Sequence, residues 1–335
     1  MSAIVDIVTG ASQGIGKAVA EYIATERSNE FINNTYDHYS VEKYRLVLVG
    51  RNEQRGKQVQ EDIQKEHPNL HVSFESCDLS DWKSVQELQQ RISAATLHRG
   101  GDDDDGHHQS YQVGILINNA AECPKRQKLV DRPYKDSSNN NVIKIASIDK
   151  QFATNVLGYH FMLRAFEDHF SLLSSSSSST TKTTTTTTHI VNVASNWAGD
   201  LDLDDLHFQK RRRYDNDTAY RQSKQCNRML NQYWSNKRLQ NKALVNACHP
   251  GDPCTTLSQD LGYNLYAPKP SKEEIATNSP FPLLCGFKTK RHHHELFATT
   301  GGWFEGTGIK PHRCQFERLS QDAERLFKLC ESFCI

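Results

Sequence analysis

The chain has 335 residues, enough for one large α/β domain or two small ones, and its 40 basic and 40 acidic side chains argue against a general attraction to nucleic acid or an anionic membrane. No segment has the ~20 apolar residues of a membrane-spanning helix, and the N-terminus lacks the basic region of a signal peptide. Nine cysteines occur without a C-x-x-C pair, so we expect a cytoplasmic protein with reduced thiols and no zinc site.

Short apolar segments alternate with segments of helical length along the chain. The segments predicted to be strands are nearly continuous in apolar residues, as in strands buried on both faces of a parallel sheet: residues 3–8, 45–50, 71–79, 113–120, 189–195 and 243–251. The segments with helical length and periodicity are residues 14–25, 53–66, 81–98, 148–170 and 218–239. This alternation predicts a doubly wound (Rossmann), mostly parallel sheet in a three-layer αβα arrangement, within a single domain over residues 1–335.

Three polar stretches are predicted to be insertions into the loops of this domain. Residues 28–44 extend the first crossover, and residues 99–112 are polar and rich in glycine and aspartate. Residues 174–188 form a serine- and threonine-rich tract that has too little apolar surface to bury. We expect 99–112 and 174–188 to be disordered loops, which a scaffold tolerates because long surface loops add little closure entropy.

The first predicted turn has the glycine pattern of a phosphate-binding loop. TGASQGIG, residues 9–16, follows the first strand and opens the first helix, with glycines at 10, 14 and 16. Glycines at these places allow a tight turn and close approach of the backbone to a pyrophosphate. The amino end of the helix then offers free N–H groups and a partial positive charge to the anion. The turn therefore predicts dinucleotide binding.

A tyrosine and a lysine lie four residues apart in TAYRQSK, residues 218–224. In a helix, Tyr220 and Lys224 would share one face, about 5–6 Å apart at Cβ. An ammonium ~4 Å from the phenol, at an effective dielectric of ~20, is worth roughly 4 kcal/mol or about three pKa units. Burial acts in the opposite direction and raises the pKa of the phenol. Taken alone, the spacing also fits an ordinary helix face.

Several motifs together resemble those of the short-chain dehydrogenase/reductase family, along most of the chain. They are the G-x-x-x-G-x-G spacing of the first turn, INNAA at 117–121 with Ala121 in place of a glycine, TNVLGYHFML at 154–163, VNVAS at 191–195, the Tyr220–Lys224 pair, and HPG at 249–251 followed by Thr255. The 25 residues from Ser195 to Tyr220, with DLDDLHF between them, look most like the retinol-dehydrogenase-like branch.

The resemblance implies an enzyme that interconverts an alcohol and a carbonyl by hydride transfer. Tyr220 would be the acid/base, and we expect Lys224, with the charge of an oxidised nicotinamide, to outweigh burial and lower the pKa of the phenol. Ser195 would position the substrate oxygen, and Asn155 would order a water that links Lys224 to solvent. The cofactor-binding residues implied are Gly10, Ser12, Gln13, Gly14, Ile15, Gly16, Arg51, Asn52, Asp78, Leu79, Asn119, Ala120, Tyr220, Lys224, Pro250, Gly251 and Thr255.

The end of the second strand favours NADP over NAD. An NAD enzyme is expected to place an acidic residue there for the ribose hydroxyls, whereas this chain has Gly50, Arg51 and Asn52. An arginine suits a 2′-phosphate by charge and by its forked donors. Gln13, in the glycine turn, is not the additional basic residue that some NADP-preferring relatives carry there.

The substrate is predicted to be a small molecule that contacts residues 252–300, and nucleic acid is not expected as a partner. FPLLCGF, residues 281–287, fits either an apolar pocket wall or a buried helix. The adjacent histidines of RHHHE, residues 291–295, are not assigned to a metal. The competing interpretation is a catalytically silent protein that binds NADP as a sensor or scaffold, against which the intact set of Asn155, Ser195, Tyr220 and Lys224 argues.

Overall fold

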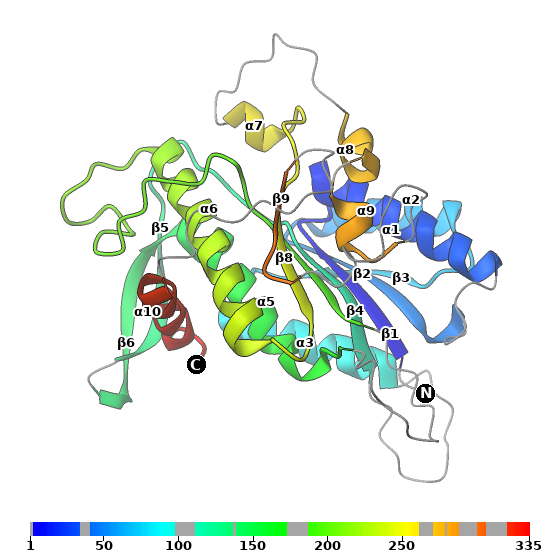
Figure 1. The fold of residues 1–335 in the computed structure, drawn as a ribbon, viewed down its shortest axis with the longest axis horizontal. Coiled ribbons are helices and arrows are strands. Elements are labelled where there is room, and N and C mark those ends of the chain that lie inside the picture. Colours follow the sequence, from blue (N-terminus) through cyan, green and yellow to red (C-terminus); the bar gives the residue numbers. More distant parts are fainter. Residues whose placement is uncertain are drawn as a thin grey trace.

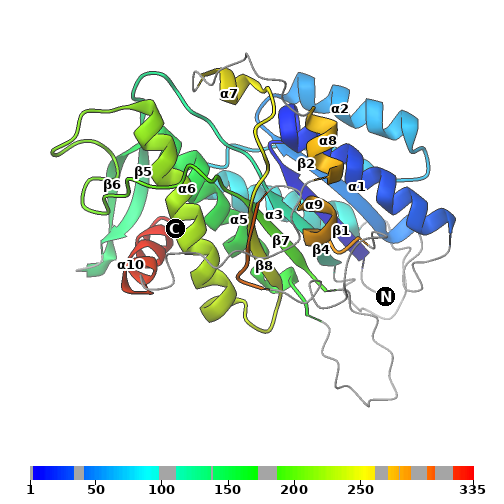
Figure 2. The ribbon, with the colours of Figure 1, turned by 45° about the horizontal axis from the view of Figure 1, so that its top comes forward.

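A computed structural model describes residues 3–33, 41–97, 111–136, 139–172, 187–260, 271–278, 280–287, 300–305 and 320–335. In this part of the chain, a seven-stranded sheet lies between two layers of helices (Figures 1 and 2). The strand order is β3-β2-β1-β4-β7-β8-β9, and each neighbouring pair is parallel. The predicted doubly wound sheet is confirmed.

The strands of the central sheet are short and most of their residues are buried. Their bounds are β1 Ala3–Thr9, β2 Tyr44–Gly50, β3 Val72–Ser76, β4 Tyr111–Asn118, β7 His189–Val193, β8 Leu244–His249 and β9 Trp303–Glu305. Every residue of β2, β4 and β8 is buried, which is why these strands lack a polar alternation in the sequence. The short strand β9 was not predicted.

Helices cover both faces of the sheet, with a hydrophobic cluster under each layer. One layer contains α1 (Gly14–Ile32), α2 (Glu53–Glu66), α8 (Lys272–Asn278) and α9 (Phe281–Leu284). The other contains α3 (Trp82–Leu97), α4 (Lys150–Phe152), α5 (Gly158–Phe166), α6 (Asn216–Tyr233) and α10 (Ser320–Ser332), with π-helical segments η2 (Ala153–Leu157) and η4 (Trp234–Arg238). Helix α7 (Thr256–Asp260) follows β8.

The predicted insertions differ from the structure at their edges. Helix α1 continues to Ile32, so the first residues of the 28–44 stretch are helical, while residues 34–40 lie outside the described residues. Residues 98–110 and 173–186, the bulk of the two predicted disordered loops, also lie outside them. Gln112, however, belongs to β4. Thr188 is buried and donates from its hydroxyl to the Val113 main-chain oxygen at 2.6 Å, so both loop boundaries were wrong.

An antiparallel hairpin follows the fourth strand of the central sheet and was not predicted. It consists of β5 (Leu129–Asp136) and β6 (Asn139–Asp149) and stands apart from the main sheet, beside α10 (Figure 1). The ring of Tyr134 on β5 lies 5.7 Å from that of Phe333, which follows α10. Helix α10 is thus held between the hairpin and α6.

The C-terminal helix is also anchored by a buried histidine. His160 Nε2 lies 3.0 Å from Glu331 Oε1, and the ligand-type atoms of His160, Glu331 and Cys334 all lie within 4.8 Å of one another. Arg164 Nε already pairs with the same carboxylate oxygen at 3.4 Å. We assign no metal to this group, because a cation already occupies its carboxylate. The histidines of RHHHE, residues 291–295, which were not assigned to a metal either, lie outside the described residues.

The first four residues of the segment FPLLCGF form the short helix α9, which is buried. Phe281, Leu284 and Phe287 are buried in the cluster beneath α1 and α2. Of the predicted substrate region, residues 261–270, 279 and 288–299 lie outside the described residues. Across the described part of the chain, no helix combines the length and the apolar character needed to cross a membrane.

Candidate active site

A cleft at the carboxyl ends of the parallel strands brings together most of the predicted cofactor-binding residues. Those that line it are Gly10, Ser12, Gln13, Gly14, Ile15, Arg51, Asn52, Asp78, Leu79, Asn119, Ala120, Tyr220, Lys224, Pro250 and Thr255. Gly16 is packed behind the turn, and Gly251 lines an adjoining cavity instead. Carboxyl ends of strands are where open α/β sheets bind ligands.

The glycine turn has the geometry that its sequence predicts. Gly10 and Gly14 have φ of +68° and +61°, a region that favours glycine. A Cβ at Gly16 would lie 2.4 Å from the Gly10 main-chain oxygen, so only glycine allows this close contact. Helix α1 begins after Gln13 with neither a side-chain cap nor an acidic residue in its first turn. Its N–H groups therefore suit a phosphate, and the cleft fits a dinucleotide.

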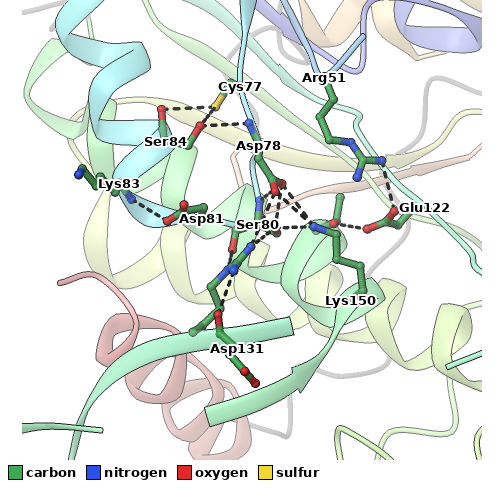
Figure 3. A network of polar contacts seen from close by, with 12 residues as sticks. Arg51, Cys77, Asp78, Ser80, Asp81, Lys83, Ser84, Glu122, Asp131 and Lys150 are labelled. Atoms are coloured by element: carbon green, nitrogen blue, oxygen red, sulfur yellow. Dashed lines mark hydrogen bonds and ion pairs between the residues drawn. The ribbon is translucent and has the colours of Figure 1, made fainter. Parts of the chain in front are cut away.

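The carboxylate of Asp78, one of the predicted cofactor-binding residues, is held by cations from the hairpin region. Asp78 accepts from Ser80 Oγ at 2.8 Å and lies 3.4 Å from Lys150 Nζ and 3.7 Å from Arg132 Nη2 (Figure 3). Burial acts to raise the pKa of Asp78, but the Ser80 hydrogen bond and Lys150 outweigh it, and the pKa lies below its usual value. Asp78 is therefore an ionised, firmly positioned acceptor at the edge of the cleft.

Two arginines lie at the end of the cleft next to β2. Arg51 Nη2 lies 3.2 Å from Glu122 Oε2, in the loop after β4. Arg55 donates to Gln13 Oε1 at 2.6 Å, and its main-chain N–H donates to the Asn52 side chain that caps α2. Arg55 was missed in the sequence, although it follows Arg51 at i+4 on the first turn of the predicted helix.

Tyr220 and Lys224 are both buried on α6, one turn apart. Lys224 Nζ donates to the Val193 main-chain oxygen at 3.0 Å and lies 5.6 Å from the centre of the Tyr220 ring. Burial lowers the pKa of Lys224 to about 7. Burial also raises the pKa of Tyr220 well above its usual value, despite a hydrogen bond with Ser195. In the side chains alone, burial therefore outweighs the attraction between the two groups. The expected lowering includes the charge of an oxidised nicotinamide and stays a prediction.

A second cavity adjoins the cleft and shares Tyr220 with it. Ser195, Trp197, His249, Gly251 and Asp252 are among its lining residues, and Tyr220 lines both spaces. The Ser195 hydroxyl oxygen accepts from the Trp197 main-chain N–H at 3.1 Å, which fixes it at the end of β7. A group held in this second cavity would face the serine and the tyrosine together.

Asn155 lies in the π-helical segment η2 and does not line the cleft. Its side-chain oxygen accepts from the Glu122 N–H at 2.9 Å, and its side-chain nitrogen donates to the Glu122 main-chain oxygen at 3.0 Å. The same nitrogen lies 3.2 Å from Ser223 Oγ on α6. The amide thus ties the loop after β4 to the helix of Tyr220. Its expected role in ordering a water stays a prediction.

Comparison with known proteins places these features in a family. A model of the short chain dehydrogenases matches residues 5–264. Human retinol dehydrogenase 13 is 27% identical over 259 residues, which are 76% of this chain and 61% of that protein. Human polyprenol dehydrogenase is 26% identical over 220 residues, 66% of this chain and 51% of that protein. The matched part of the chain thus spans between half and two thirds of the length of these relatives.

Solved structures share the fold at lower sequence identity. A protein from Mycobacterium paratuberculosis superposes with a TM-score of 0.59 at 18% identity, over 99% of this chain and 93% of that one. A short chain dehydrogenase from Escherichia coli CFT073, solved with NADPH, has a TM-score of 0.56 at 17% identity, over 91% and 97%. With its family model covering most of the sheet and the site, the chain belongs to the short-chain dehydrogenase family.

Proposed function

We propose that the protein is an NADP-dependent oxidoreductase that interconverts an alcohol and a carbonyl. The observation that carries this proposal is the position of Tyr220, which lines both the cleft of the glycine turn and the cavity of Ser195. A group that exchanges a proton with a substrate oxygen must lie between the cofactor and the substrate. Tyr220 is the side chain that meets this requirement with a titratable oxygen.

The catalytic roles follow from the same arrangement. Ser195 holds the substrate oxygen against Tyr220, and Tyr220 takes the hydroxyl proton from the alcohol or returns it to the carbonyl. NADP, when bound, supplies or accepts the hydride, and its oxidised nicotinamide adds the positive charge that favours the phenolate. Lys224 adds to that positive charge when it is protonated. Asn155 holds the loop after β4 against α6 through its bonds to Glu122 and Ser223.

The preference for NADP is supported by the two cations next to β2. Arg51 and Arg55 both line the cleft, at the place where an acidic residue would bind the ribose hydroxyls of NAD. A 2′-phosphate there would meet forked, charge-assisted donors. The Escherichia coli structure named above was solved with NADPH, which is consistent with this choice.

For the substrate and the compartment we propose only a class of compound and a type of environment. Human retinol and polyprenol dehydrogenases, by their names, act on lipophilic alcohols, and we propose an alcohol or carbonyl of this type. The nine cysteines of the sequence include no C-x-x-C pair, and we propose a reducing compartment such as the cytoplasm on that ground.

A coupled screen tests the proposed function. NADPH oxidation is followed with retinal, steroids, aliphatic aldehydes and quinones, and each active compound is repeated with Tyr220→Phe. Turnover of a carbonyl by the wild type and its loss in the variant would support the proposal. NADPH binding without turnover of any compound would favour the silent sensor or scaffold, and absence of binding to either dinucleotide would reject both.

A further inference from the structure

An ion pair joins Arg51, which lines the cofactor cleft, to Glu122, which follows the cleft residue Ala121. Arg51 follows β2 and Glu122 lies in the loop after β4, and 3.2 Å separates Arg51 Nη2 from Glu122 Oε2. In Figure 3 the arginine side chain extends from its own strand end toward the glutamate. Strand β1, with the glycine turn at its end, lies between β2 and β4 in the sheet. The pair therefore reaches across the loop that is expected to bind the phosphates.

Glu122 is the more firmly held member of this pair. Its main-chain N–H and oxygen are both bonded to the side-chain amide of Asn155, at 2.9 and 3.0 Å. Its second carboxylate oxygen accepts from the hydroxyl of Thr154. The Glu122 side chain is 20% exposed and that of Arg51 is 53% exposed. Opening the pair therefore moves the arginine, while the carboxylate remains where it is.

We propose that Glu122 is a specificity-determining residue, which competes with the cofactor's 2′-phosphate for Arg51. This inference rests on the proposed function, in which Arg51 binds that phosphate. A 2′-phosphate must either draw Arg51 away from Glu122 or bind Arg51 together with Glu122, in which case the negative carboxylate lies close to the negative phosphate. NADH carries no 2′-phosphate, so it neither uses Arg51 nor meets this competition. Glu122 thus narrows the difference in affinity between NADPH and NADH that Arg51 creates.

Arg55 is a second cation for the 2′-phosphate, and Glu122 does not compete for it. Its guanidinium contacts the neutral amide of Gln13 at 2.6 Å rather than a carboxylate. It lines the same end of the cleft as Arg51 and stays available to the phosphate without breaking an ion pair. Arg51 is then the residue whose contribution Glu122 reduces, and Arg55 contributes independently of Glu122.

The test compares dissociation constants of NADPH and NADH for the wild type, Glu122→Gln, Arg51→Ala and the double variant. Glutamine keeps the main-chain bonds to Asn155 and an oxygen for Thr154. Exposed ion pairs are worth little, so we expect Glu122→Gln to tighten NADPH about two- to fivefold and to leave NADH unchanged. In the Arg51→Ala background the same substitution should change NADPH affinity by less than about 1.5-fold.

Glu53→Gln is the matched control. Glu53 begins α2, close to Arg51 in the sequence, and pairs with Lys57 at 2.6 Å. Its replacement removes one negative charge near the site without releasing Arg51, so the affinity for NADPH should be unchanged. Melting temperatures establish that each variant is folded, and Glu122→Ala replaces Glu122→Gln if the glutamine variant is not.

The outcomes separate this inference from the proposed function. Weaker NADPH binding by Glu122→Gln would mean that the glutamate positions Arg51, and equal changes for both cofactors would mean that it acts only through the loop. Either result would overturn the proposed competition and leave the proposed function standing. The same holds if Glu122→Gln leaves NADPH affinity unchanged while the wild type binds NADPH and Arg51→Ala binds it more weakly. A wild type that binds no NADPH would overturn both.

Discussion

Lys224 Nζ lies 5.6 Å from the centre of the Tyr220 ring, one turn further along α6, and both side chains are buried. In this arrangement burial acts on both groups in the direction of the neutral form. The ammonium is stabilised by the Val193 carbonyl at 3.0 Å, not by a phenolate. The charged form of the pair therefore depends on what binds beside it.

The buried lysine predicts a pH dependence of stability. Burial lowers the pKa of Lys224 to about 7 in the folded protein, whereas an unfolded lysine has a pKa of ~10.4. Between these values the unfolded chain holds a proton that the folded chain does not. The free energy of unfolding therefore rises with pH in this window, by up to ~1.4 kcal/mol per pH unit for one proton. The stability gained in this way is lost again as pH falls to about 7, where the folded protein also takes up the proton.

Urea unfolding of the wild type and Lys224→Met, at intervals from about pH 7 to about pH 9, measures this effect. The wild type should gain stability relative to the variant as pH rises. Lys57→Met is the control, because pairing with Glu53 raises the pKa of Lys57 and keeps it protonated in both states throughout the window. Parallel curves for the wild type and Lys224→Met would show that Lys224 is not titrating there.

The central sheet and the lining of the cleft could be predicted because they depend on local patterns. Strands buried on both faces give apolar runs, and the carboxyl ends of parallel strands meet at one edge of the sheet, so motifs at those ends meet as well. Spacing of Tyr220 and Lys224 on one helix face is likewise a local property. These features require no knowledge of how distant side chains pair.

The hairpin and the side-chain partners could not be predicted in the same way. Strand β5 alternates between exposed and half-buried residues, includes Pro133, and packs near α10, almost 200 residues later in the chain. The contact of Lys224 with Val193 and that of Arg51 with Glu122 depend on where separate elements lie in three dimensions. For this reason the sequence did not show that burial outweighs the attraction of Lys224 for a Tyr220 phenolate in the side chains alone.

Replacing Arg51 by alanine should weaken NADPH binding and spare NADH. A charged hydrogen bond to the 2′-phosphate contributes about 1.5–3 kcal/mol, or roughly 10- to 150-fold in the dissociation constant. Part of this contribution is offset in the wild type, because Arg51 must leave Glu122 to bind the phosphate. Isothermal titration of both cofactors measures the change. Arg91→Ala serves as the control, because Arg91 pairs with Glu75 and does not line the cleft. Equal NADPH affinity in the wild type and Arg51→Ala would remove Arg51 from the phosphate site.

The serine- and threonine-rich tract predicts a contrast between a deletion and a point substitution. Ser171 and Thr188 are adjacent, since the Thr188 N–H donates to the Ser171 oxygen at 2.7 Å, so a short turn can replace residues 174–186. That deletion should leave the free energy of unfolding nearly unchanged, because the tract has little apolar surface to bury. Thr188→Val should cost about 1–3 kcal/mol, because it leaves the Val113 oxygen and the Ser171 N–H without their partner. Chemical denaturation measures both, and a deletion as costly as Thr188→Val would give the tract a structural role.

Tyr220→Phe tests the acid/base assignment most directly. Phenylalanine keeps the ring and its packing but removes the hydroxyl of the tyrosine that lines both cavities. General acid/base groups contribute about 10²- to 10⁴-fold, so turnover of a substrate found in the screen should fall by that factor, while NADPH affinity changes little. Tyr214→Phe makes the same chemical change at a tyrosine that lines neither cavity and donates to the Pro124 oxygen at 2.7 Å, so it should retain turnover. Near-wild-type turnover by Tyr220→Phe, or equal losses in the two variants, would mean that Tyr220 does not exchange the proton.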